Sequence, residues 1–108
     1  MRSDIAAEIL RVHRDSYGTG ARDVEVHILT EAVMVILDIE LTPAERTLMG
    51  ANREDAVKET RETFLDAIAP TFKAIVEHAT GRRVSSFLGA ISLEPLYAVE
   101  LFRFARHG

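Results

Sequence analysis

Residues 32–41, AVMVILDIEL, decide the fold. From Ala32 to Leu37 this run is apolar at every position, which is typical of a strand buried on both faces. The segment before it, Asp23 to Thr30, alternates apolar and polar residues and predicts a half-buried strand. A tight connection at Thr30-Glu31 joins the two runs, so the sequence predicts a hairpin whose second strand lies inside a sheet.

Helical patterns flank this hairpin. Apolar residues recur at helical spacing from Ser3 to about Tyr17, where YGTG ends the pattern. The segment Thr42-Pro43-Ala44-Glu45 combines a capping Thr, a Pro at the first helical position and a Glu at the third, and therefore predicts a helix start with a capping box. After Gly50, a longer amphipathic helix is expected from Asn52, as its N-cap, to Ala79.

The length of that second helix makes Pro70 important. A straight helix from Asn52 to Ala79 would span about 42 Å, whereas a globule of this size is roughly 34 Å across. A proline inside a helix removes one backbone hydrogen bond and clashes with the preceding turn. We therefore expect a kink or a restart at Pro70.

Two further strands are predicted at 83–89 and 97–105, on either side of a connection that contains Pro95. The element order is then α-β-β-α-β-β. This order predicts a two-layer α+β fold, in which one face of a four-stranded antiparallel sheet is covered by helices, including the long Pro-kinked one. At 108 residues the chain is expected to form a single domain, 1–108.

Composition and charge narrow the classes of function. The chain has 47% hydrophobic and 28% charged residues, no cysteine and a net charge of −4. Without cysteine, disulfides, thiol nucleophiles and thiolate metal sites are excluded, and we expect a cytoplasmic protein. The N-terminal segment carries charge throughout, so neither a signal peptide nor membrane insertion is expected. The acidic balance makes a nucleic-acid partner unexpected, because the field would repel phosphates.

Few residues fit known catalytic or metal-binding patterns. The histidines His13, His27, His78 and His107 have no partner at metal-ligand spacing, so no metal site is expected. YGTG follows a helix and precedes a strand, the reverse of a phosphate-binding loop. Ser85 and Ser86 lie in a predicted strand without the G-x-S-x-G elbow of a nucleophile, so no catalytic residue is expected, and no cofactor is expected either.

Four residues stand out as candidates for ligand binding. Glu25 lies beside His27 on one face of the predicted strand, where a carboxylate can orient an imidazole as a base. Arg61, Glu77 and Glu100 are charges set in or beside apolar stripes, and structural ion pairs are the first interpretation. The alternative is a pocket between helix and sheet, in which Arg61 clamps a ligand carboxylate with the help of Glu100, His27 and Glu25.

The apolar pattern also predicts protein interfaces. Since two helices can cover only one face of the sheet, Met34 and Ile36 on the second strand are expected to meet another copy of the chain, giving a homodimer. The predicted connection LGAISLEPLY at 88–97 is unusually apolar, and its Ile91, Leu93 and Leu96 are expected to form a contact surface.

The chain as a whole resembles the MpsC family. The resemblance rests on YGTG at 17–20, VEVHILTEAVMVILDIELTPAERTL at 24–48, Arg61, VEHATGRRVSSFL at 76–88 and AVELF at 98–102. Two departures from the family pattern are Ala21-Arg22, where a proline is expected, and the apolar GAISLEP, where a polar loop is expected. A partner surface built from that loop would differ in this chain.

The family is named after a Na⁺-translocating membrane-potential-generating system. The resemblance implies a cytosolic protein linked to membrane systems for cation or inorganic-carbon uptake, placed at the periphery of a membrane complex and in contact with a membrane protein. It supplies no catalytic residue. We therefore expect a non-enzymatic accessory module, with a small-molecule-binding domain or small enzyme as the alternative.

Overall fold

One antiparallel sheet organises the chain, and the computed structural model describes it over residues 1–106. Its four strands are β1 (Ala21–Ile28), β2 (Ala32–Ile39), β3 (Val84–Leu93) and β4 (Leu96–Phe104). They lie in the order β1-β2-β4-β3, so β2, which carries the doubly apolar run 32–37, lies inside the sheet beside β4. The order α-β-β-α-β-β and the α+β class are confirmed.

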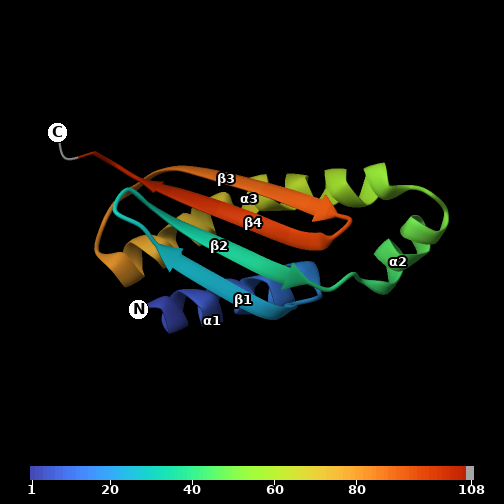
Figure 1. Ribbon diagram of the computed structural model, residues 1–108, viewed down its shortest axis with the longest axis horizontal. Coiled ribbons are helices and arrows are strands. Elements are labelled where there is room, and N and C mark those ends of the chain that lie inside the picture. The colour runs from blue at the N-terminus through green and yellow to red at the C-terminus, as the bar shows by residue number, and fades with distance from the viewer. Residues whose placement is uncertain (107–108) are drawn as a thin grey trace.

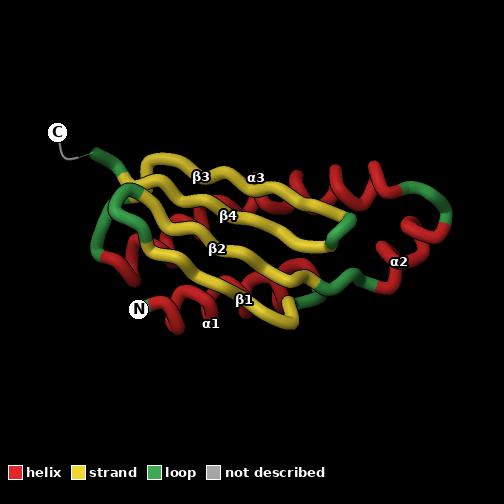
Figure 2. Tube along the Cα trace, in the orientation of Figure 1, coloured by secondary structure: helices red, strands yellow, loops and turns green. Residues whose placement is uncertain are grey.

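Both long helices lie on one side of this sheet. In Figure 1 the sheet faces the viewer, with α1 (Arg2–Val12) behind β1 and α3 (Glu54–Thr80) behind β3. The short helix α2 (Pro43–Gly50) lies beyond the end of the strands. Within residues 1–106 no helix covers the face of the sheet that is turned toward the viewer (Figures 1 and 2).

The first helix ends in an unusual way. After Val12 the chain continues as one π-helical turn, His13–Tyr17, labelled η1. Gly18 then adopts a left-handed conformation with φ of 101°, which glycine reaches without steric cost. The predicted helix end at YGTG is confirmed, and the π-helical turn places His13 against the core, where 4% of it is exposed.

Helix α2 begins as predicted, whereas α3 begins at a different residue from the one expected. Thr42 accepts a hydrogen bond from the backbone N–H of Glu45, and the Glu45 side chain accepts one from the backbone N–H of Thr42, which confirms the capping box. The prediction that Asn52 caps α3 is wrong. Asn52 has φ of 60° in the turn between the helices, and Arg53 takes the N-cap position without a side-chain bond.

Pro70 does not divide α3. The helix is continuous over 27 residues with Pro70 inside it, so the expected restart is absent. The expectation assumed a round globule, whereas the described chain measures 49 × 24 × 22 Å. A helix of this length is about 40 Å long and fits along the longest axis.

Strand β3 is longer than predicted, whereas β4 has the predicted length and begins one residue earlier, and the two meet at a tight turn, Glu94-Pro95. The expectation of an exposed apolar loop at 89–95 is therefore wrong, because most of GAISLEP is strand. Ile91 belongs to the core and is only 6% exposed, and the partly buried Leu93 and Leu96 pack against the core. Alternation explains the apolar residues here, since every second side chain of β3 points to the helices.

The core lies between the sheet and the two long helices. It combines alternate residues of the strands with the inner stripes of α1 and α3. The largest fully buried apolar side chains are Phe72, Phe102, Phe104, Ile5, Ile9, Leu37, Ile39 and Leu65.

Candidate interaction surface and buried polar networks

The uncovered face of the sheet carries an apolar patch. On β2 the residues Val33, Val35, Leu37 and Ile39 are buried toward the helices, so the residues between them point to the open side. Strand register places these in two rows that cross the sheet. One row is His27, Met34, Leu101 and Leu88, and the other is Glu25, Ile36, Val99 and Ala90.

Six of these eight residues are apolar, and we call them the open-face patch: Met34, Ile36, Leu88, Ala90, Val99 and Leu101. Leu88 is the most exposed large hydrophobic side chain of the described residues, at 67%. Contiguous apolar surface of this kind on a sheet marks a contact site more often than a solvated face. The sequence predicted Met34 and Ile36, and the alternation within β3 and β4 supplies the other four.

Charges of opposite sign lie at the two ends of the patch. Arg103 of β4 pairs in register with Ala32 and Ser86, one row beyond Leu101. At the other end Asp23 of β1 lies opposite Asp38 of β2, and Arg22 approaches Asp38 at 3.6 Å between Nε and Oδ2. The patch therefore has a basic end and an acidic end.

A buried ion pair joins the helices near the end of the sheet. Arg61 of α3 donates two hydrogen bonds to the Glu45 carboxylate of α2, both 2.7 Å long, and a third of 2.8 Å to the Glu40 carbonyl. The guanidinium also lies 4.5 Å from the centre of the Tyr17 ring. The first interpretation of Arg61, a structural ion pair, is what the geometry shows.

Titration of this network follows from its contacts. Burial of Glu45 raises its pKa, but the hydrogen bonds from Arg61, the Thr42 N–H and Tyr17 together hold the pKa below its ordinary value of 4.5. Burial and the hydrogen bond to Glu45 raise the pKa of Tyr17, whose hydroxyl donates to Glu45 at 2.7 Å. Glu45 is thus a carboxylate that accepts four hydrogen bonds. The sequence had identified this residue only as part of a helix cap.

A second buried pair lies deeper in the core. His13 Nε2 and Glu100 Oε2 are 2.7 Å apart, with the two side chains 5% and 0% exposed. The His13 ring stacks on Phe72 and approaches Phe64 at 5.9 Å. Glu100 Oε1 has no hydrogen-bond partner among the described residues. Sequence reasoning missed His13, although its position one residue after the buried Val12 on the helix was a usable signal.

The four predicted ligand residues do not converge. Arg61 and Glu100 lie on the helix side of the sheet, each bound to its own partner. Glu25 and His27 lie on the open side, 4.0 Å apart between Oε1 and Nε2 and about half exposed. The remaining charge, Glu77, accepts a hydrogen bond from the Val84 N–H at the start of β3.

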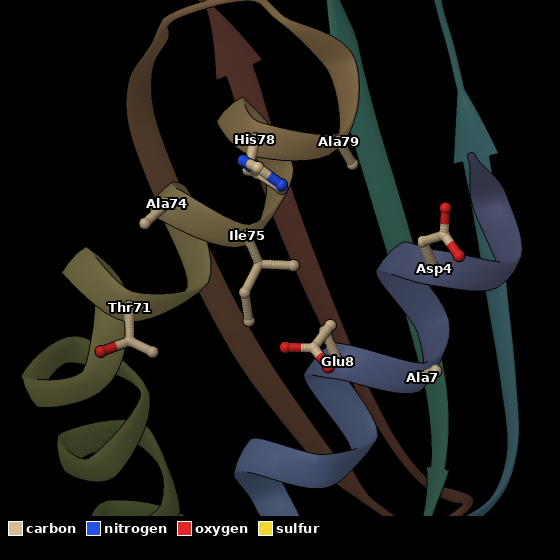
Figure 3. Close-up of a pocket in the computed structure, with 8 residues that line it drawn as sticks. All are labelled: Asp4, Ala7, Glu8, Thr71, Ala74, Ile75, His78 and Ala79. Carbon is tan, nitrogen blue, oxygen red and sulfur yellow. The ribbon is translucent and has the colours of Figure 1, made fainter.

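A groove runs between α1 and α3 on the outer side of the helical layer. Asp4, Ala7 and Glu8 form one wall, and the side chain of Ile75 projects from α3 toward α1 (Figure 3). His78 lies near the upper end of the groove on α3. Small side chains line much of this surface, and none of the paired residues Arg61, Glu45, His13 or Glu100 reaches it.

The profile of the family described as "Na+-translocating membrane potential-generating system (MpsC)" matches residues 1–106. The chain belongs to the MpsC family. The resemblance expected from the TGRRV and AVELF segments is confirmed; TGRRV joins the end of α3 to the start of β3, and AVELF lies in β4.

A curated relative of this MpsC chain is the "Uncharacterized protein YbcI" of Bacillus subtilis (strain 168). The two are 31% identical over 88 residues, which are 81% of this chain and 71% of YbcI. No solved structure matches the chain significantly.

Two general properties of the described residues bear on function. None of the helices within 1–106 is both long and apolar enough to span a membrane. No group of three or more His, Asp or Glu side chains in that part of the chain is arranged to hold a metal ion. The sequence prediction about His107 lies outside the described residues.

Proposed function

We propose that this MpsC protein is a non-enzymatic accessory module of a membrane system for ion or inorganic-carbon transport, in which it acts by binding other protein chains. The observation that carries the proposal is the open-face patch, because the fold leaves six neighbouring apolar residues without a covering helix. The family description supplies the link to Na⁺ translocation and membrane potential. A cytoplasmic position at the periphery of a membrane complex is part of the proposal.

The state of the charged residues supports binding rather than catalysis. The Nε and Nη2 groups of Arg61 donate hydrogen bonds to Glu45 and to the Glu40 carbonyl, so the edge that could clamp a ligand carboxylate already binds these groups. Glu100 is fully buried against His13. The alternative hypothesis, a ligand site built from Arg61, Glu100, His27 and Glu25, has less support because the sheet separates these residues into two groups.

Transport measurements in cells test the proposal. In the source organism, deletion of the gene is expected to reduce uptake of radiolabelled bicarbonate or the Na⁺-dependent part of the membrane potential. The wild-type gene restores the lost activity, whereas the Leu88→Lys variant does not. The matched control is Thr63→Lys, which adds the same charge at an exposed position of α3. Unchanged transport in the deletion strain would contradict the proposal.

A further inference from the structure

The open-face patch has a pattern that fits a second copy of itself. We infer that two chains pair face to face through this patch, with the strands of one copy running antiparallel to the matching strands of the other. The inference deepens the proposed function and rests on its claim that the open face binds protein. It names the partner as this same chain and fixes the relative direction of the two sheets.

Symmetry and side-chain size support this direction. Consider a two-fold axis midway between the two stacked sheets, perpendicular to the strands and passing between the two rows of the patch. It places the Met34 row of one copy over the Ile36 row of its partner. Leu88 then faces the small Ala90 of the partner's β3, and Leu101 faces Val99 on β4. Larger side chains therefore meet smaller ones in the pairs of β3 and β4, as interdigitated sheet faces require.

Charge supports the same direction. Rotation about the axis across the strands places Arg103 over Tyr97 of the partner's β4, with Asp38 of the partner's β2 one strand away, so the basic end lies over the acidic end. It also places Glu25 over His27 of the partner's β1, so the residues beside the patch attract across the interface. An axis along the strands would instead bring like ends together, which costs free energy.

The available area is sufficient. Strands of eight residues are about 27 Å long and four strands are about 19 Å wide, so the flat face measures about 500 Å². Two such faces bury about 1,000 Å², the lower size of a specific interface. A second copy fits this area without any change in the fold, and it leaves the groove between α1 and α3 free for a partner of different sequence.

Sedimentation velocity of the purified full chain tests the inference, over concentrations from about 1 to about 100 µM, where interfaces of this size associate. The wild-type chain is expected to be a dimer in the upper part of this range. Leu88→Lys raises the dissociation constant at least about 100-fold, because a two-fold interface contains each substitution twice. Thr63→Lys leaves the constant unchanged, and thermal unfolding shows that both variants are folded.

The direction of pairing is tested with charge reversals. Arg103→Glu is expected to weaken the dimer at least about tenfold, and adding Asp38→Lys to the same chain restores it. A dimer that is indifferent to Leu88→Lys or to Arg103→Glu overturns the inference. A wild-type chain that is monomeric throughout also overturns it and assigns the face to another protein. The transport measurement is independent of this result, so the two proposals fail separately.

Discussion

Replacement of Arg61 by Met tests how the helical layer is held together. The substitution keeps an unbranched side chain but removes both 2.7 Å hydrogen bonds to Glu45 and the 2.8 Å bond to the Glu40 carbonyl. Glu45, which is 5% exposed, then keeps only the bonds from Tyr17 and the Thr42 N–H. Loss of one partner of a buried ion pair costs about 3–5 kcal/mol, and we expect Arg61→Met to lower the free energy of unfolding by this amount.

Urea unfolding followed by circular dichroism measures the effect. A small domain has a total stability of about 5–15 kcal/mol, so the urea midpoint should fall by about a fifth or more. The control is Arg11→Met, because Arg11 pairs with Glu8 and Asp15 on the exposed side of α1 and its loss should leave the midpoint unchanged. A loss below about 1 kcal/mol for Arg61→Met would refute the assignment of a stabilising buried pair.

Three further predictions concern the same core. The pKa of Glu45 is lower in the folded chain than in the unfolded chain, so the stability that the Glu45 carboxylate contributes is complete above pH 4.5 and is lost as the pH falls below that value. The free energy of unfolding should therefore decrease more steeply with falling pH in the wild type than in Glu45→Gln. His13→Phe and Glu100→Leu should each cost about 3 kcal/mol, but the double variant should cost clearly less than their sum, and additive losses would contradict a coupled pair. Gly89→Ala should cost about 1–3 kcal/mol in urea unfolding, because the new Cβ would lie 2.8 Å from Leu65 Cδ1, and adding Leu65→Val should recover part of the loss.

The sequence predicted the fold well where a short local motif specifies one backbone geometry. The capping box at Thr42 and the helix end at the YGTG segment follow from backbone chemistry alone, and both are present. The apolar run 32–37 identified a central strand: β2 lies between β1 and β4, with one face packed on the helices and the other in the open-face patch. The restart at Pro70 was expected from the overall shape of the molecule, which the sequence did not supply, and the helix is continuous there. The N-cap at Asn52 was wrong because Asn52 lies in the turn between α2 and α3.

The candidate site was predicted only in part, since it depends on pairing between distant segments. Met34 and Ile36 were assigned to the open face from their place in β2. Leu88, by contrast, becomes part of the patch only through its register with Leu101. The partner of Glu100 was likewise hidden, because His13 is 87 residues away and enters the core through a π-helical turn.

Thiol crosslinking tests the central claim, that the open face joins two copies of the chain. The protein has no cysteine, so Val99→Cys places a single thiol near the middle of the open-face patch, and Thr63→Cys places one on the outer surface of α3. With a short thiol-to-thiol crosslinker, we expect a covalent dimer for Val99→Cys and monomer for Thr63→Cys. Monomer from Val99→Cys, or equal crosslinking of both variants, would contradict it.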